Sequence, residues 1–442
     1  MHIIKNAQVV NNGKITQLDV AINGQFIEKI EKDITPNGND TVTDATGMLL
    51  LPGMIDDQVH FREPGLTHKG NIYSESRAAI AGGITSFMEM PNVKPSTTTS
   101  EALKEKHAIA QQSSLGNYSF YLGATPDNLE EIKRVDPSWV CGVKVFMGAS
   151  TGDLLVDHPQ ALENIFRECP TLIATHCENG AVIAKNTEKL AQTVSTFEPI
   201  HHPIMRDAEA CYQSSSYAVD LAKKFNSDLH VLHLTTAKEM SLFDKGPIEN
   251  KKITAEACVH HLWFNQDDYP SHGNFIKCNP AIKAETDRLA LIQAINEDRI
   301  DIIATDHAPH TLSEKHVPFA EAPAGLPLVE HALLTLLEQV NRGAMTLPKV
   351  VEKVCHNPAL RYKVDKRGFI EEGYYADLVL VDPSSSLIAS HDNVHYLCKW
   401  TPFNGVKFSH RIAATFVNGQ QAYDGSKFAN QSSAMPLSFN RN

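Results

Sequence analysis

The stretch that decides the fold reads Met48-Leu-Leu-Leu-Pro-Gly-Met-Ile-Asp-Asp-Gln-Val-His-Phe-Arg-Glu-Pro-Gly65. An apolar run, Met48-Leu-Leu-Leu51 leading to Ile55, passes into a group of polar side chains. A short apolar run bounded by turn residues is typical of a buried strand, and polar residues beyond it are typical of a loop that carries function. We therefore predict a buried strand that ends at a site.

Seven further short runs of apolar or β-branched residues follow along the middle of the chain. They are Ile84–Met88, Tyr118–Leu122, Val143–Phe146, Thr171–Ala174, Leu229–Leu232, Ile253–Ala255 and Ile300–Ile303. Helical patterns lie between them, and the clearest are Tyr73–Ala81, Ala208–Phe225, Asp287–Glu297 and Leu328–Gln339. Eight strands that alternate with helices predict an α/β fold, a closed parallel (β/α)8 TIM barrel. An open doubly wound sheet is the alternative, weakened because its usual phosphate-binding glycine fingerprint is missing from the sequence.

The two ends of the chain have a different pattern, with alternating polar and apolar residues broken by Asn-Gly turns. The strand candidates are Leu18–Ile22, Ala376–Val381 and Ala413–Val417, and the turns are Asn11-Asn12-Gly13, Asn23-Gly24 and Asn418-Gly419. We predict that residues 1–52 and 368–442 pair into one small β-sandwich domain. Residues 53–367 then form the metal-dependent barrel.

Composition excludes several classes of protein. The 442 residues carry a net charge of -12, which argues against a nucleic-acid partner because phosphate binding needs a basic surface. The eight cysteines are scattered without a CxxC pair, as in reduced intracellular enzymes. The first residues lack the apolar run of a signal peptide, and no run of apolar residues is long enough to span a membrane. The chain is therefore predicted to be soluble and cytoplasmic, with no membrane partner.

Side chains suited to metal or acid-base chemistry gather where the predicted strands end. They are Gln58, His60, Asn92, Lys144, His176, His233, Asp306 and His310. The carboxyl ends of barrel strands all face one mouth, so these residues should converge there. Each has an ordinary alternative, since most of the 21 histidines need only a hydrogen bond. The pair His260-His261 is ambiguous and is interpreted as supporting or structural.

Lys144 and Asp306 are the most unusual members of this set. A lysine inside Gly142-Val-Lys-Val-Phe-Met147 is costly to bury as a cation, so it either extends to the surface or is neutralised. Reaction with carbon dioxide would give a carbamate that can bridge two cations. Asp306 could bind a metal and also move a proton. The alternative of a helix cap is weakened because Ala308-Pro309 makes the segment loop-like.

Together these motifs resemble the dihydroorotases, in the cyclic amidohydrolase branch of the amidohydrolase superfamily. The resemblance begins with Asp56–Gly65 and covers nearly the whole chain. It continues through Met90-Pro-Asn92, Lys144-Val-Phe146, His176-Cys-Glu178, Leu232-His-Leu234, Asn279-Pro280, Ala304–His310, Gly373–Val381 and Thr401–Gly405. Arg62 and Asn92 favour dihydroorotase over hydantoinase or allantoinase, because a guanidinium fork matches a substrate carboxylate that those other rings lack. A surface salt bridge between Arg62 and Glu63 is the alternative.

The resemblance implies roles for the strand-end residues. His60, His176 and His233 would bind zinc, carboxylated Lys144 would bridge two ions, and Asp306 would be both ligand and general acid-base. The substrate contacts would be Arg62, Asn92, Asn279 and His310. A metal-activated hydroxide would then drive the reversible cyclisation of N-carbamoyl-L-aspartate to L-dihydroorotate in de novo pyrimidine biosynthesis. The segment Thr311–Leu326, rich in proline, is expected to be a mobile loop over the mouth.

One position departs from the family pattern. The first strand normally ends in His-x-His, and here the first of these positions is Gln58. An amide oxygen is a weaker zinc ligand than imidazole, so Gln58 is a doubtful ligand. A normal pair of metals, a single firm metal and an inactive homologue all remain open. Related alternatives are a hydantoinase or allantoinase, and an inactive scaffold that associates with aspartate transcarbamoylase; a homodimer also remains open.

Overall fold

The computed structural model describes residues 1–148 and 154–441, and it contains two large sheets. One of them is built from parallel strands in sequential order, from β6 next to β7 through to β12 next to β13. Its strands are β6 (Met54–Val59), β7 (Ile84–Glu89), β8 (Asn117–Gly123), β9 (Gly142–Phe146), β10 (Ile173–His176), β11 (Leu229–Val231), β12 (Ile253–Cys258) and β13 (Ile302–Ala304). A parallel bridge between Val59 and His307 joins the last strand's extension to the first. The predicted (β/α)8 barrel is therefore confirmed.

Helices surround this sheet, so nearly every strand residue is buried on both faces, as expected for a parallel barrel. The helices are α1 (Ile72–Ala81), α2 (Ser100–Ser113), α3 (Leu129–Lys133), α4 (Pro159–Glu168), α5 (Gly180–Ala191), α6 (His202–Met205), α7 (Ala208–Phe225), α8 (Val259–Trp263), α9 (Tyr269–His272), α10 (Glu285–Asn296), α11 (Leu312–Lys315), α12 (Ala332–Asn341), α13 (Leu347–Val351) and α14 (Asn357–Tyr362). The predicted α7 is matched in full, because Asp207 caps its first turn and Asn226 ends it in the left-handed region.

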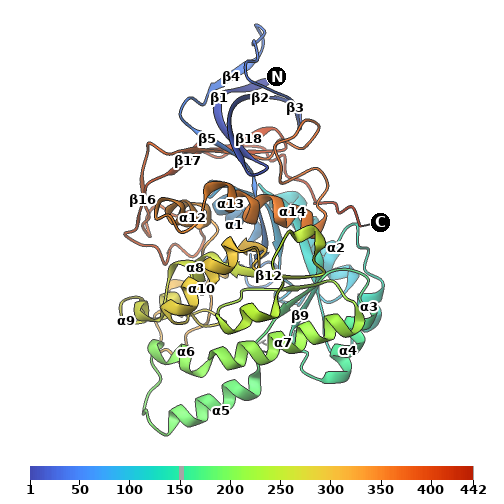
Figure 1. Cartoon of the computed structure of the whole chain (residues 1–442), viewed down its shortest axis with the longest axis vertical. Helices are drawn as coiled ribbons and strands as arrows, with labels where there is room; N and C mark the ends of the chain where they lie inside the picture. The colour runs from blue at the N-terminus through green and yellow to red at the C-terminus, as the bar shows by residue number, and fades with distance from the viewer. Residues whose placement is uncertain (149–153, 442) are drawn as a thin grey trace.

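The other large sheet combines strands from the N-terminal and C-terminal parts of the chain at one end of the molecule, whereas the C-terminus itself lies lower, against the barrel (Figure 1). Its strands are β1 (His2–Asn11), β2 (Lys14–Asn23), β3 (Phe26–Glu31), β4 (Thr41–Asp44), β5 (Leu49–Pro52), β14 (Leu378–Asp382), β17 (Arg411–Val417) and β18 (Gln420–Tyr423). Strand β5 lies between β1 and β14 and so connects the two ends. A further short pair is formed by β15 (Leu387–Ile388) and β16 (Lys407–Phe408). The domain limits at residues 52 and 367 stay predictions.

Two sequence expectations need correction. The run Met48–Leu51 does not lead the barrel, because β5 pairs in the terminal sheet and the first barrel strand starts at Met54. The chain changes sheets at Gly53, where any Cβ would collide with the Thr85 side chain. The helix expected from Leu328 starts instead at Ala332, and the backbone N–H of Leu328 donates to the ring of His307 at 2.9 Å.

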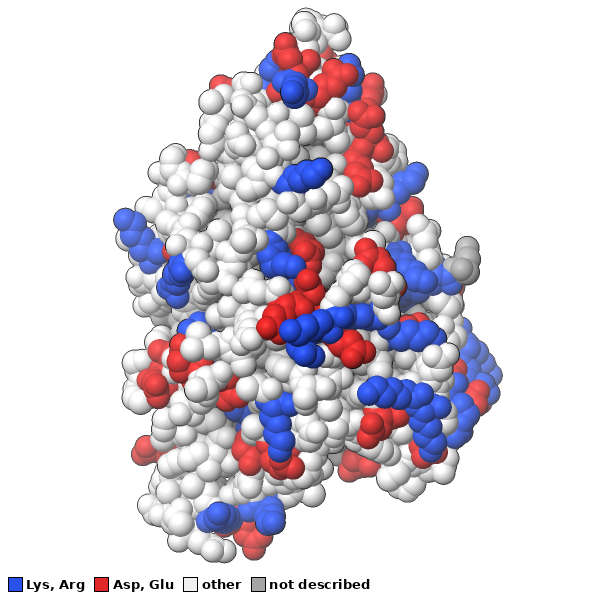
Figure 2. Space-filling view, in the orientation of Figure 1, with Lys and Arg blue, Asp and Glu red and all other residues white. Residues whose placement is uncertain are grey.

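Basic and acidic side chains are both present on the face of the molecule in view. Figure 2 shows acidic side chains lying among the basic ones rather than apart from them. In the described part of the chain, no helix has both the length and the apolar character that a membrane span requires.

Candidate active site

All ten side chains predicted as site residues line one cavity of about 290 Å³ at the carboxyl ends of the barrel strands. They are Gln58, His60, Arg62, Asn92, Lys144, His176, His233, Asn279, Asp306 and His310. We call this space the mouth cavity. A larger cavity of about 630 Å³ beside α5 and α7 has no histidine, lysine or arginine among its described lining residues. Chemistry rather than size therefore identifies the mouth cavity as the candidate site.

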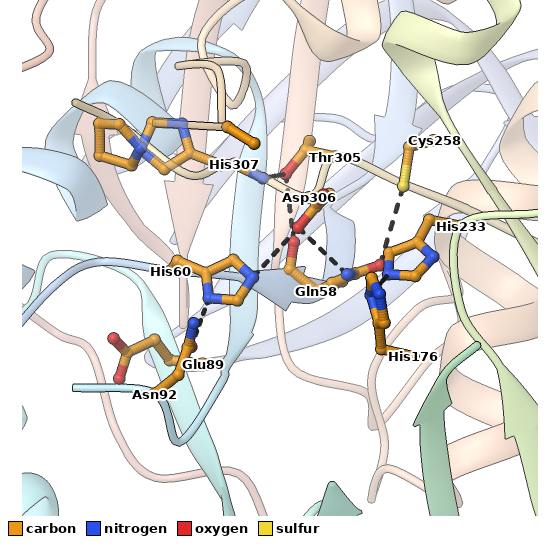
Figure 3. A network of polar contacts seen from close by, with 12 residues as sticks. Gln58, His60, Glu89, Asn92, His176, His233, Cys258, Thr305, Asp306 and His307 are labelled. Carbon is orange, nitrogen blue, oxygen red and sulfur yellow. Dashed lines mark hydrogen bonds and ion pairs between the residues drawn. The ribbon is translucent and has the colours of Figure 1, made fainter. Parts of the chain in front are cut away.

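Asp306 lies at the centre of one half of the mouth cavity (Figure 3). Its Oδ1 atom is 3.1 Å from His60 Nε2 and accepts a 3.1 Å hydrogen bond from Gln58 Nε2. His60 Nδ1 lies 2.6 Å from Asn92 Oδ1, so this ring nitrogen carries the proton. Burial lowers the pKa of His60 and so favours the neutral ring, in which Nε2 is an acceptor. The Nε2 lone pair of His60 therefore faces an oxygen of the Asp306 carboxylate. A cation bound between these two atoms would be coordinated by both.

The other half of the mouth cavity holds two facing imidazoles. His176 Nδ1 lies 2.9 Å from His233 Nε2, and both rings are buried. His176 Nε2 lies 3.1 Å from Glu178 Oε2, which also accepts a 2.5 Å bond from Arg206. Because His176 donates through Nε2, its Nδ1 lone pair points at His233. Carboxylate support on the outer nitrogen is the usual arrangement behind a metal-binding histidine.

Lys144 lies on β9, beside Ala174 of β10, and is only 1% exposed. Its Nζ atom sits 4.7 Å from the centre of the Phe146 ring and has no hydrogen-bond partner among the described residues. Burial lowers the pKa of Lys144 to about 8. The side chain therefore does not extend to the surface, and the lowered pKa gives its amine an accessible neutral form near physiological pH, where the protonated form still predominates.

The cavity also presents a buried cation without a carboxylate partner. Arg62 is 6% exposed, donates through Nε to the Pro309 carbonyl at 3.1 Å, and lies 3.1 Å from His310 Nε2. Within residues 1–148 and 154–441 it forms no ion pair, and Glu63 instead accepts from the backbone of Ile72. Burial lowers the pKa of Arg62 to about 10. An anion in the mouth cavity would supply the partner that this guanidinium lacks.

Three of these residues hold strained backbone. Arg62, His233 and Asp306 have φ values of 71°, 38° and 52°, in a backbone region that residues other than glycine rarely adopt. Such strain gathers where the surrounding structure fixes a functional side chain.

The segment expected to cover the mouth is held by two buried lysines. Lys315 Nζ donates to the carbonyls of Pro323 and Gly325 at 2.9 and 3.0 Å, and Lys277 Nζ donates to Phe319 and Ala322. Residues 323–325 line the mouth cavity directly. The position over the mouth agrees with expectation, and the mobility of the segment stays a prediction.

Sequence reasoning missed the residues that support the site. Glu178 stood in a quoted motif but was given no role, although it links His176 to Arg206. Thr305 and Asp56 were also missed, and a 2.6 Å hydrogen bond between their side chains joins the residue that follows β13 to the interior of β6. The available signal was proximity in the sequence: Thr305 directly precedes Asp306, and Glu178 lies two residues after His176.

Comparison with known proteins agrees with this geometry. A model of the amidohydrolase family matches residues 49–422, and the chain belongs to that family. Within it, the chain is similar to the dihydroorotase of Halobacterium salinarum, 32% identical over 96% of this chain and 97% of that protein. It is also similar to the dihydroorotase of Bacillus subtilis, 29% identical over 96% of this chain and 98% of that protein. The resemblance seen in the motifs is thereby confirmed.

Solved structures of other cyclic amidohydrolases share the fold. The L-hydantoinase (dihydropyrimidinase) from Arthrobacter aurescens has a TM-score of 0.93 at 25% identity, with 99% of each chain covered. The dihydropyrimidinase from Brevibacillus agri has a TM-score of 0.89 at 24% identity, with both chains covered in full. The fold is therefore common to enzymes of different ring substrates, and the substrate must be argued from the site.

Proposed function

We propose that this protein is a dihydroorotase, which interconverts N-carbamoyl-L-aspartate and L-dihydroorotate in pyrimidine biosynthesis. The observation that carries the proposal is Arg62, a buried guanidinium with no carboxylate partner among the described residues, in the same cavity as His60 and Asp306. Dihydroorotate carries a carboxylate that takes no part in ring opening, whereas hydantoin carries no carboxylate. A planar fork of N–H donors suits that group.

The donor atoms in the mouth cavity fit zinc. His60 with Asp306, and His176 with His233, present nitrogen and oxygen lone pairs to one another at 2.9 to 3.1 Å. Lys144 would complete the set as a carbamate, since its amine has no other partner among the described residues. A zinc ion bound to such residues supplies Lewis acidity toward the carbonyl of the ring.

The chain's own residues divide the remaining work. Arg62, Asn92 and His310 would hold the substrate carboxylate. Asn279, which lines the same cavity, would contact the ring. Asp306 would accept a proton during ring opening and return it to the departing water during ring closure. Residues 323–325 would exclude bulk water from the bound substrate.

Gln58 is best explained as a positioning residue rather than as a ligand. Its Nε2 donates to Asp306 Oδ1, and its Oε1 accepts from the Cys258 thiol at 3.7 Å. The Gln58 amide thus points an N–H donor toward the site. A metal ligand would have to point a lone pair there instead. We propose that Gln58 fixes the Asp306 carboxylate, and that the metal position beside His60 binds zinc less firmly than the position beside His176 and His233.

A hydantoinase is the second candidate, because the solved structure with a TM-score of 0.93 is an L-hydantoinase. A catalytically silent scaffold for aspartate transcarbamoylase is a third. Zinc-loaded protein should be assayed with dihydroorotate, hydantoin and allantoin. Preference for hydantoin or allantoin would support the sister enzymes. Turnover of none of them, combined with binding to aspartate transcarbamoylase, would support the scaffold.

Arg62→Ala tests the substrate assignment. We expect kcat/KM for dihydroorotate to fall by about 10²- to 10³-fold, because removing one partner of a buried charge pair costs about 3–4 kcal/mol. Hydrolysis of hydantoin, which has no carboxylate, should change by less than about threefold. Ultraviolet absorbance follows both reactions. Arg62→Lys is the matched control, because it keeps the charge without the fork and should recover part of the loss. Unchanged kcat/KM for dihydroorotate in Arg62→Ala would remove the basis of the assignment.

A further inference from the structure

A second group of potential metal ligands lies next to the mouth cavity but does not line it. It consists of Cys258, at the end of β12, and His260 and His261 in α8, and we call it the Cys258 cluster. All three are buried, with exposed fractions of 0%, 0% and 3%. Their ligand atoms lie within 4.8 Å of one another. A Cys-x-His-His segment thus presents one sulfur and two imidazoles to a shared point.

The imidazoles of the Cys258 cluster have unsatisfied nitrogens. His261 Nε2 lies 3.1 Å from the Pro280 carbonyl, so it carries the proton and leaves Nδ1 as a bare lone pair. Neither that atom nor either ring nitrogen of His260 makes a hydrogen bond of normal geometry in the described part of the chain, although the Thr305 backbone lies near the His260 ring. Buried polar atoms without partners are rare because each loses its hydration without compensation. A ring that donates to a backbone carbonyl through one nitrogen and offers the other is the usual form of a metal-ligating histidine.

The thiol has only weak partners. Cys258 Sγ is 3.5 Å from Glu256 Oε1 and 3.7 Å from Gln58 Oε1, and both are acceptors. A sulfur and two imidazole nitrogens form a donor set that suits zinc and cobalt rather than magnesium or calcium. The other buried group of this kind, Asp57 with His230 and Glu256, already contains a cation for its carboxylates, because His230 lies 3.2 and 3.4 Å from them and has a pKa raised to about 9.

We propose that Cys258, His260 and His261 bind one zinc-class divalent ion in a site separate from the mouth cavity. Binding replaces the S–H bond of Cys258 by a metal–sulfur bond and releases the thiol proton to water. With bond lengths of about 2.0–2.3 Å, tetrahedral ligands lie roughly 3.3–3.6 Å apart, so the three side chains close by about 1 Å around the ion. Gln58 Oε1 loses the S–H donor and faces the ion as a fourth ligand. The site thereby ties α8 and β12 to the amide that orients Asp306.

Cobalt substitution of the full-length protein tests this site by spectroscopy, independently of activity. Metal-free protein titrated with Co²⁺ should develop a sulfur-to-cobalt charge-transfer band in the near ultraviolet, saturating at about one equivalent per chain. The residues proposed as ligands in the mouth cavity offer only nitrogen and oxygen, so this band reports a cysteine ligand. A wild-type protein that binds Co²⁺ without the band would overturn the proposal.

Variants of single residues assign the band. Cys258→Ser should abolish it and reduce bound metal by one equivalent, whereas Cys141→Ser, a change at another buried barrel cysteine, should leave it intact. Lys144→Ala, which disables the mouth cavity, should also retain it; this outcome keeps the test independent of the proposed function. A band that survives in Cys258→Ser would refute the site.

If Cys258→Ser is poorly folded, His261→Gln should weaken cobalt binding at least tenfold while the thiol remains present, and unchanged affinity would equally refute the site.

Discussion

Lys144→Ala is expected to lower kcat for dihydroorotate by about 10⁴-fold, equivalent to about 5 kcal/mol of transition-state stabilisation. The residue is buried in the middle of β9, and burial lowers the pKa of its amine to about 8. A neutral amine can attack carbon dioxide, forming an N–C bond and releasing one proton to water. The resulting carbamate supplies the anionic oxygens that a pair of divalent ions needs beside neutral imidazoles. Alanine cannot form it, so metal content should fall together with kcat.

The measurement is metal content per chain alongside kcat, in protein purified without chelators. Loss of Lys144 removes no hydrogen bond found in the described residues, so the variant should stay folded, with a Tm close to that of the parent. Lys144→Arg is the matched control, because it keeps a cation but cannot form a carbamate, and it should be as inactive as Lys144→Ala. Partial recovery of Lys144→Ala by added acetate or propionate would identify the missing group as a carboxylate. Two retained metals and an unchanged kcat would contradict the bridging role.

The strand pattern predicted the barrel well because parallel barrel strands are buried on both faces and read as short apolar runs. The same property explains the error at Met48–Leu51. A buried strand in the terminal sheet has the same composition as a barrel strand, and only its partners, β1 and β14, distinguish the two. Pairing depends on segments more than 300 residues away, such as Leu378–Asp382, which no local pattern reveals.

The candidate site was predictable because the carboxyl ends of all barrel strands lie at one mouth. A polar residue at such a strand end is therefore expected to lie at that mouth. That rule indicated eight of the ten predicted side chains that line the cavity, and the family resemblance added Arg62 and Asn279. The rule says nothing about which atom of a side chain faces its neighbour. The amide of Gln58 turns its nitrogen to Asp306 because Cys258 occupies its other side, and this three-residue contact exists only in the folded chain. For the same reason the His176–Glu178–Arg206 chain was not foreseen.

Asp306→Asn is the second change with a large expected effect, and it separates proton transfer from structure. Asparagine tolerates the left-handed backbone at this position, where φ is 52°, as readily as aspartate. Its side-chain oxygen can still accept the 3.1 Å bond from Gln58 Nε2, so the fold and the shape of the cavity should persist. What is lost is the carboxylate that moves the proton and faces His60 Nε2. We therefore expect kcat to fall by about 10³-fold in both directions of the reaction, within the range set by general acid-base catalysis.

Asp301→Asn provides the control, because Asp301 is a buried carboxylate near the opposite end of β13, paired with Lys251 at 2.6 Å. It should lower Tm, since removing one partner of a buried pair leaves Lys251 uncompensated, while kcat stays within about twofold of the parent. Asp306→Asn should show the reverse, with Tm nearly unchanged and kcat greatly reduced. Measuring kcat and Tm of both variants on the same zinc-loaded preparation decides the matter. If Asp306→Asn keeps more than about a tenth of the parental kcat, a different group carries the proton, and His60, 3.1 Å away, becomes the residue to test next.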